Sequence, residues 1–283
     1  MHFWQLARPL NLLIAGLTFG LAAWLSALGS FQFVLDYRFW LELGAILSAM
    51  AGGYWINDVF DFRIDQINRP AKTLVGLAIS RKKVLTGYFV SLGVVLLLTL
   101  PLPWKFWLVN LSAVAALYWY AAVFKRYAVV GNVLIAALTA LVVLAGALLY
   151  HLKFPLFWGM VFAFQSTLLR EVVKDVEDLR GDLRHGLQTL PIAIGLSPTR
   201  RVLTVGYGMF FVSLWLPVGF HYVYEGVWLL NYLAVVLAFV QLPIAYCLFL
   251  LHTSYKPSQY RFQSRVLKGI MAGGLVSLLF LPL

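Results

Sequence analysis

Eight of the eleven acidic residues fall into two short stretches that lie more than a hundred residues apart. The first stretch contains Asp58, Asp61 and Asp65, and the second contains Glu171, Asp175, Glu177, Asp178 and Asp182. Both stretches directly follow apolar sequence. Placing a carboxylate at the end of a membrane-embedded helix costs free energy, so such a residue indicates a functional site. Two such groups of oxygen ligands predict one divalent-cation site assembled from two halves.

The spacing within each stretch places most of these carboxylates on one side of a helix. Residues advance by about 100° along a helix, so Asp58, Asp61 and Asp65 lie within about 60° of one another. A comparably narrow stripe is formed in the second stretch by Glu171, Asp175, Asp178 and Asp182. Glu177 falls off this stripe, and we expect it to be a solvated charge.

Like charges on one helical face repel each other by several tenths of a kcal/mol for each pair, so the stripes need compensation. Mg²⁺ is suited to this role because it binds one or two carboxylates together with waters and phosphate oxygens. Two facing stripes could hold two ions with a diphosphate between them. Basic residues near enough in the sequence to neutralise further phosphate charge are Arg63, Lys72, Arg170 and Lys174.

The elements that position these residues must lie in a membrane. Of the 283 residues, 62% are hydrophobic and 12% charged, which excludes an ordinary soluble domain. The apolar runs are continuous rather than alternating, which argues against a membrane β-barrel. We expect one all-α domain over residues 1–283, a polytopic bundle of about nine spans: 10–29, 39–57, 84–102, 106–124, 129–150, 155–169, 202–222, 227–251 and 266–283.

The distribution of basic residues predicts how these spans are oriented across the membrane. All but Arg38, Lys105 and Lys153 of the 22 Lys and Arg lie in the N-terminal segment, in the connections after even-numbered spans or, for Lys268, at the start of the ninth span. Because positive charge is retained on the cytoplasmic side, we expect the N-terminus and both acidic stretches to face the cytoplasm, at the plasma membrane. Attraction to anionic headgroups of membrane lipids explains these basic loops, so we expect no nucleic-acid partner.

Two alternatives remain for the acidic stretches. They could be solvated helix ends paired with neighbouring Lys and Arg, although that does not explain two same-face stripes on one side of the membrane. They could also serve a transporter as an ion relay. Such relays bury one or two carboxylates near the middle of the bilayer, whereas these lie at helix ends.

Both stretches resemble the aspartate-rich motifs of the UbiA superfamily of intramembrane prenyltransferases. The first matches as Asn57-Asp58-x-x-Asp61-x-x-x-Asp65, and the second as Asp175-x-x-Asp178-x-x-x-Asp182. Other pieces that agree are Arg8-Pro9-x-Asn11 at the start of the first span, the stretch from Tyr118 to Lys125-Arg126, and Gly131-Asn132. The resemblance covers nearly the whole chain, including the spans and the loops that carry the motifs.

The resemblance implies Mg²⁺-dependent transfer of an isoprenyl group from a prenyl diphosphate to a lipophilic acceptor. The implied metal ligands are Asp58, Asp61 and Asp65 for one ion and Asp178 and Asp182 for the other, with Asp175 near either. Lys174 and Arg63 would grip the phosphates, Asn57 would orient the metal shell or the diphosphate, and Asn11 would face the same cavity. The residues expected to act most directly in catalysis are Asp61, Asp178, Lys174 and Asn57.

The same chemistry requires a dry cavity around the allylic cation that forms when the diphosphate leaves. Aromatic faces stabilise cations. The residues expected to supply them are Tyr54, Trp55, Tyr118, Trp119 and Tyr120.

The acceptor is suggested by finer features of the resemblance. Asp65-Gln-Ile-Asn68-Arg69-Pro70 and the second motif with Thr189-Leu-Pro191 resemble the branch that transfers a geranylgeranyl group to the hydroxyl of geranylgeranylglycerol phosphate, in ether-lipid synthesis. The chain has Thr73-Leu-Val-Gly76 where that branch usually has a Pro-Ser-Gly turn, so a quinone precursor or a (bacterio)chlorophyllide is the alternative acceptor. Basic residues that could hold the acceptor's phosphate are Arg69, Lys72, Lys125 and Arg126.

Overall fold

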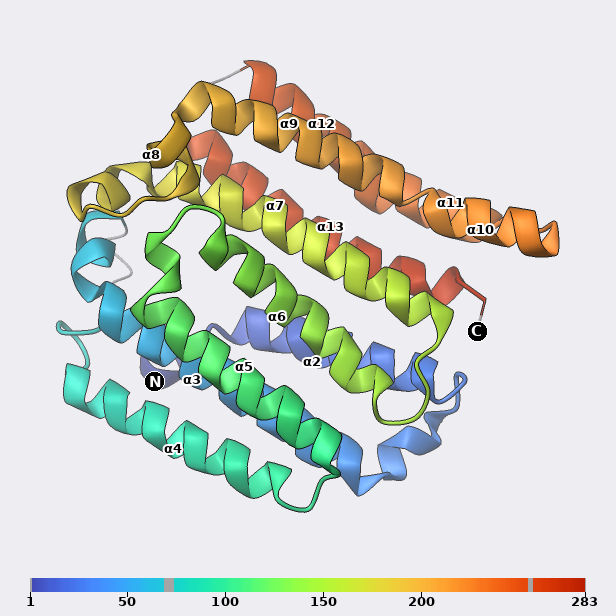
Figure 1. Ribbon diagram of the computed structural model, residues 1–283, viewed down its shortest axis with the longest axis horizontal. Helices are drawn as coiled ribbons and strands as arrows, with labels where there is room; N and C mark the ends of the chain where they lie inside the picture. Colours follow the sequence, from blue (N-terminus) through green and yellow to red (C-terminus); the bar gives the residue numbers. More distant parts are fainter. Residues whose placement is uncertain (1, 69–73, 254–256, 283) are drawn as a thin grey trace.

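The computed structural model describes residues 2–68, 74–253 and 257–282, and the regular structure in these ranges is helical apart from two isolated β-bridges. The long helices lie side by side in one bundle (Figure 1). The helices that make up this bundle, some of them short, are α2 (Pro9–Ser26), α3 (Tyr37–Asn68), α4 (Arg81–Thr99), α5 (Trp104–Ala122), α6 (Val130–Ala147), α7 (Phe154–Arg184), α9 (Leu196–Ser213), α10 (Leu216–Glu225), α11 (Leu230–Val236), α12 (Leu242–Thr253) and α13 (Pro257–Ser277). The predicted all-α membrane bundle is confirmed.

Short elements connect or extend these helices. They are α1 (His2–Leu6), η1 (Phe31–Leu35), η3 (Phe124–Arg126), α8 (Leu190–Ile194), η4 (Leu237–Gln241) and η5 (Leu278–Phe280). Each of the nine predicted spans contains helix. In the described ranges, seven helical segments are long and apolar enough to cross a membrane, and α5 and α13 are not among them. α13 carries three basic residues, and α5 mixes aromatic and polar residues with its apolar ones.

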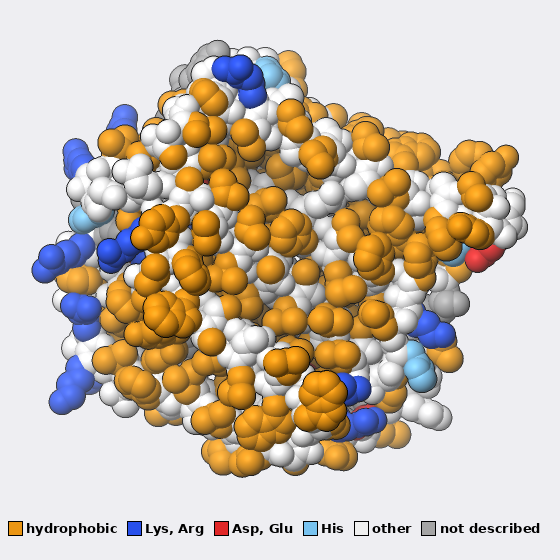
Figure 2. Space-filling view, viewed as in Figure 1, with side chains coloured by type: hydrophobic (Ala, Val, Ile, Leu, Met, Phe, Trp, Pro, Cys, Tyr) orange, Lys and Arg blue, Asp and Glu red, His pale blue; other side chains and the backbone are white. Residues whose placement is uncertain are grey.

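The two acidic stretches form the C-terminal turns of α3 and α7, which have 32 and 31 residues. At 1.5 Å per residue each helix is about 45–50 Å long, more than the roughly 30 Å of a bilayer's hydrocarbon core. The acidic turns can therefore extend past the apolar part of the bundle. On the face shown in Figure 2, Lys and Arg gather along the edge where these turns lie, and hydrophobic side chains cover the middle.

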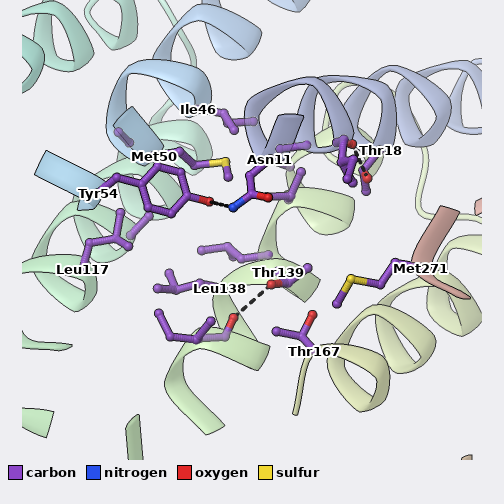
Figure 3. A pocket seen from close by; sticks show the side chains of 18 of the residues that line it. Asn11, Thr18, Ile46, Met50, Tyr54, Leu117, Leu138, Thr139, Thr167 and Met271 are labelled. Carbon is purple, nitrogen blue, oxygen red and sulfur yellow. Dashed lines mark hydrogen bonds between the residues drawn. The ribbon is translucent and has the colours of Figure 1, made fainter. Parts of the chain in front are cut away.

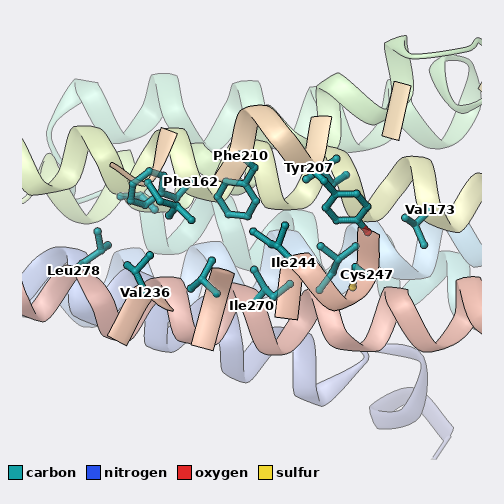
Figure 4. Packing of buried hydrophobic residues seen from close by; sticks show 14 of the residues in the cluster. Phe162, Val173, Tyr207, Phe210, Val236, Ile244, Cys247, Ile270 and Leu278 are labelled. Atoms are coloured by element: carbon teal, nitrogen blue, oxygen red, sulfur yellow. The ribbon is translucent and has the colours of Figure 1, made fainter. Parts of the chain in front are cut away.

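Two clusters of buried side chains hold the bundle together. One joins α7, α9, α12 and α13 through residues such as Phe162, Tyr207, Phe210 and Ile244 (Figure 4). The other joins α2, α3, α5 and α6 and includes Phe19 and Phe106. The second motif helix, α7, belongs to the first cluster, and the first motif helix, α3, belongs to the second.

Two predicted spans are interrupted. The seventh is divided between α9 and α10 just before Pro217, because proline lacks the N–H of a continuing helix and disfavours helix in the preceding residue. The eighth contains a π-helical segment, η4, between α11 and α12. At η4 a Cβ added to Gly273 of α13 would lie 2.7 Å from Phe239 Cβ and 2.9 Å from Phe239 O, so this glycine lets α13 pack directly against the π-helical backbone.

Candidate active site

The carboxylates of the first motif are bonded to cations from other parts of the chain. Asp58 is 7% exposed and accepts a hydrogen bond from Arg8 Nη2 at 2.6 Å. Asp61 is contacted by Lys125 Nζ and accepts a hydrogen bond from Asn57 Nδ2 at 2.8 Å. Burial lowers the pKa of Lys125, and the attraction of Asp61 opposes that shift. The end of α3 is thus tied to the segment before α2 and to η3.

Arg8 holds an unusual backbone conformation at this point. Its φ of 54° lies in the left-handed region, which residues other than glycine rarely adopt. Its guanidinium also lies 4.5 Å from the centroid of the Tyr54 ring, one helical turn before Asp58. A strained backbone that orients a side chain toward a buried carboxylate is a recurrent feature of functional sites.

The second motif is bonded in the same way from α6 and from α7 itself. Asn132 Nδ2, in the first turn of α6, donates to Asp175 Oδ2 at 2.7 Å. Glu171 is 6% exposed and pairs with Arg170 and, at 3.9 Å, with Lys174. Asp182 is buried and Asp178 is half-buried. Asp65, in the first motif, is also half-buried.

The expectation that Glu177 is a solvated charge was wrong. Its side chain is 8% exposed, and Arg261 Nε of α13 donates to Glu177 Oε1 at 3.1 Å. Helix α13 packs against α7 and supplies this partner. The helical spacing in the sequence identified the face of α7 on which Glu177 lies. It could not show that another helix covers that face.

The oxygen ligands of the two motifs suit a hard divalent cation. Within the described residues, no three His, Cys, Asp or Glu side chains are close enough to enclose a metal ion by themselves. Asn57 Oδ1, beside Asp61, is buried and has no hydrogen-bond partner, so it presents an oxygen that a cation or an ordered ligand would satisfy. The carboxylates and this amide therefore fit an ion whose shell is completed by water and phosphate oxygens.

A largely apolar cavity of about 200 Å³ begins next to the motifs (Figure 3). Tyr54, one turn before Asp58, and Arg170, directly before Glu171, both line it. The lining comes from six helices: α2, α3, α5, α6, α7 and α13. On α6 it extends from Ile135 to Ala145, which corresponds to about 15 Å of helix. Such a slot can hold an isoprenyl chain away from water.

Polar residues from three helices meet at the end of the cavity near the motifs. Asn11 Nδ2 donates to Tyr54 Oη at 3.1 Å, and Lys268 Nζ donates to Asn11 Oδ1 at 2.9 Å (Figure 3 shows the first bond). Asn11 thus faces the cavity, as predicted, and links α3 to α13. The role of Lys268 was not anticipated, although it is the only charged residue of the predicted span 266–283.

The opposite end of the cavity is also polar. Asn110 lines it and donates from Nδ2 to Glu42 Oε2 at 2.9 Å and to Thr99 Oγ1 at 3.0 Å. Glu42 is fully buried, and its Oε1 has no hydrogen-bond partner. The spacing of the motifs gave no indication of this second buried polar group.

Some predicted site residues lie away from the cavity. Of the five aromatic residues expected in its wall, only Tyr54 lines it. Tyr118 is 39% exposed and packs edge-on against Phe60, because α5 turns Leu117 inward instead. Arg63 is exposed over the Phe62 ring, 5.5 Å from its centroid.

The basic residues expected to hold an acceptor phosphate are also distributed differently. Lys125 contacts Asp61 of the first motif, because the two opposite charges attract each other at this half-buried position. Arg126 has an exposed side chain, and its backbone carbonyl accepts a hydrogen bond from Gln188 N at 2.9 Å, next to the isolated bridge between Tyr127 and Gln188. Arg69 and Lys72 lie outside the described residues.

Comparison with known proteins identifies the family. Residues 13–268 match the UbiA prenyltransferase family. A digeranylgeranylglyceryl phosphate synthase of Thermococcus gammatolerans is 37% identical over 195 residues, which is 68% of this chain and 69% of that protein. One from Haloquadratum walsbyi is 40% identical over 167 residues, which is 57% of each chain.

Solved structures show the same fold. A digeranylgeranylglyceryl phosphate synthase structure superimposes with a TM-score of 0.73 and 25% identity, over 98% of this chain and 96% of that one. A UbiA homologue from Archaeoglobus fulgidus bound to GPP and Mg²⁺ gives a TM-score of 0.66 at 18% identity, over 98% and 99% of the chains. This chain therefore belongs to the UbiA prenyltransferase family and is an integral membrane enzyme that transfers a prenyl group.

Proposed function

We propose that this enzyme transfers a geranylgeranyl-type group from its diphosphate to the hydroxyl of geranylgeranylglycerol phosphate, with Mg²⁺, at the cytoplasmic face of the plasma membrane. The observation that carries the proposal is the apolar cavity that begins next to both acidic motifs and has Arg170 and Lys268 in its lining. The names of the relatives from Thermococcus and Haloquadratum support this acceptor. Residues 1–283 act as one membrane domain, because the cavity draws on helices from α2 to α13.

Mg²⁺ would be held by Asp58, Asp61 and Asp65 on α3 and by Asp175, Asp178 and Asp182 on α7. Bound there, it would neutralise charge on the departing pyrophosphate. Lys125 and Lys174 add positive charge beside the two motifs, and the amide of Asn57 orients Asp61. These groups lower the cost of breaking the allylic C–O bond.

The cavity controls which nucleophile reaches the allylic carbon. Its apolar walls keep the isoprenyl chain dry, so water does not capture the allylic carbon before the acceptor does. The ring of Tyr54, fixed between Arg8 and Asn11, lies at the end where the reacting carbon must sit. The acceptor hydroxyl then forms the new C–O ether bond with the allylic carbon, and the departing pyrophosphate takes up the proton of the hydroxyl.

The direct test incubates the purified protein in detergent with geranylgeranyl diphosphate, Mg²⁺ and one acceptor at a time. The acceptors are geranylgeranylglycerol phosphate, a hydroxybenzoate quinone precursor and chlorophyllide. We expect product with the glycerol phosphate lipid and none after chelation of the metal. Product with an aromatic acceptor or chlorophyllide alone would discard the proposed acceptor. Ion flux in proteoliposomes without any prenyl transfer would discard the enzyme reaction altogether.

The same assay tests the motifs. Asp61→Ala and Asp178→Ala should each abolish transfer while the protein still unfolds cooperatively on heating in detergent. Glu225→Gln is the matched control, because Glu225 lies half-exposed at the end of α10, away from both motifs. Near-normal transfer by either aspartate variant would contradict a metal site built from two motifs.

A further inference from the structure

We propose that Lys268 and Arg170, with Thr167, form a binding site for the phosphate of the acceptor lipid, distinct from the groups that hold the donor's diphosphate. This inference rests on the proposed function and specifies how the enzyme recognises its second substrate. The ligand chemistry is a phosphate monoester attached to an apolar chain.

The charges of the cavity lining favour an anion. Among the described residues that line it, Lys268 of α13 and Arg170 of α7 carry charge and none is a carboxylate. The remaining lining is apolar apart from a few hydroxyl and amide groups. Arg170 pairs with Glu171 and Lys268 bonds to Asn11, and a bound anion would add a partner for the remaining donors of both cations. The positive charges at the mouth of the cavity therefore favour binding of a negatively charged headgroup.

Two buried groups on α7 lack hydrogen-bond partners at this position. Thr167 is 3% exposed, lines the cavity and has no partner for Oγ1. Arg170, one turn further along the same face of α7, has a buried Nε without a partner, while its Nη1 contacts Glu171. Buried polar atoms are nearly always satisfied in native proteins, so these two indicate a missing ligand. Phosphate oxygens accept from both a hydroxyl and a guanidinium N–H.

The third contact comes from α13. Lys268 Nζ donates to the neutral amide oxygen of Asn11 at 2.9 Å and faces the same cavity. In Figure 3 Thr167 of α7 and Met271, one turn beyond Lys268 on α13, lie on neighbouring sides of the cavity. A headgroup between these helices would therefore lie within the lining of the apolar slot, with Arg170 between it and Glu171.

The donor's diphosphate has its own cations. Lys125 contacts Asp61 and Arg8 contacts Asp58, so both sit directly on the first motif. A second anion placed among those carboxylates would be repelled, and it needs separate positive groups. Lys268 belongs to α13, a helix that carries neither acidic motif. We therefore assign Lys268 and Arg170 to the acceptor.

The test measures KM for each substrate in Lys268→Met, Lys268→Arg and Thr167→Val. Losing one charge-assisted phosphate contact weakens binding by about ten- to a hundredfold. We expect Lys268→Met to raise KM for geranylgeranylglycerol phosphate by that factor and to leave KM for geranylgeranyl diphosphate unchanged. Lys268→Arg should restore most of the affinity, and Thr167→Val should raise the same acceptor KM by a smaller factor.

Arg265→Met is the matched control, because Arg265 is exposed on the same helix and does not line the cavity. It should leave both KM values unchanged. Stabilisation of the detergent-solubilised protein by the acceptor against heat provides a readout that does not require turnover. We expect that stabilisation to be lost in Lys268→Met, reduced in Thr167→Val and retained in Arg265→Met.

Three outcomes would overturn the site. An unchanged acceptor KM in both Lys268→Met and Thr167→Val would exclude these residues from headgroup binding. An increase confined to the donor's KM would assign them to the diphosphate. In both cases wild-type transfer to the glycerol phosphate lipid would leave the proposed function intact. Failure of the wild type to use that lipid would instead reject the proposed function, and this site with it.

Discussion

Lys125 Nζ contacts the carboxylate of Asp61, although 64 residues separate the two along the chain. Their side chains are 9% and 17% exposed, so the pair is largely shielded from bulk water. Removing one member of a buried pair leaves the other charge uncompensated. The contact therefore places a fixed positive charge at the first motif, where a diphosphate would bind.

Replacing Lys125 with Met should raise KM for geranylgeranyl diphosphate by about ten- to a hundredfold, because one charge-assisted contact to phosphate is lost. The acceptor KM should stay unchanged, which is the reverse of the pattern expected for Lys268. Lys125→Arg, which retains the charge, should be less impaired. Steady-state kinetics with each substrate varied in turn would check this, and a larger effect on the acceptor would contradict the assignment.

Asp175 and Glu177 differ in what they contact, and activity should follow that difference. Asp175 accepts from Asn132 across the site, whereas Glu177 bonds to Arg261, whose side chain is 57% exposed. Asp175→Asn should lose most transfer activity, and Glu177→Gln should keep it. Such a partly exposed pair stabilises a fold by only about 0–1 kcal/mol. Equal loss of turnover in the two variants would show that the helical phase of α7 was misread.

The polar group at the far end of the cavity should matter for stability. Asn110→Leu leaves Glu42 buried without its amide partner, at a cost of about 1–3 kcal/mol. Glu42→Leu combined with Asn110→Leu should recover much of that loss, since no polar group is then stranded. Thermal unfolding of the detergent-solubilised variants would measure both effects. If the losses of the two single variants simply add, the residues are not coupled.

Acid should weaken the protein at the opposite end of the bundle from the motifs. Arg38 bonds to both carboxylate oxygens of Asp36, and Tyr150 Oη donates to Oδ2 at 2.9 Å. The hydrogen bonds from Arg38 lower the pKa of Asp36 below its ordinary 3.8. The stabilisation is thus complete above pH 3.8 and is lost as the pH falls through the lowered pKa.

Asp36→Asn removes this titration. The variant should melt at a lower temperature than the wild type near neutral pH, and the difference should shrink as the pH falls below the pKa of Asp36. Thermal unfolding measured across that pH range tests the sign. A difference that stays constant with pH would mean that Asp36 does not titrate within this network.

The sequence predicted the motif helices because carboxylate spacing and hydropathy are local properties. Asp58 and Asp61 lie on α3 and Asp175 on α7 as the spacing indicated. The hydrogen-bond partners of these carboxylates could not be predicted from local spacing. The bonds from Arg8, Lys125 and Asn132 depend on how segments distant in the sequence pack together. Lys268 could have been singled out from the sequence, because a single charge inside an apolar membrane span costs free energy and therefore indicates a functional residue.

The bond from Gln188 N to Arg126 O has a mechanical consequence. Arg126 directly follows Lys125, and Gln188 lies shortly after Asp182, so this backbone bond joins the segment that holds the first motif to the segment that ends the second. Drawing α7 away from α3 would strain that bond and pull Lys125 off Asp61. The position of Lys125 at the first motif is therefore linked, through one backbone bond, to the segment that follows the second motif.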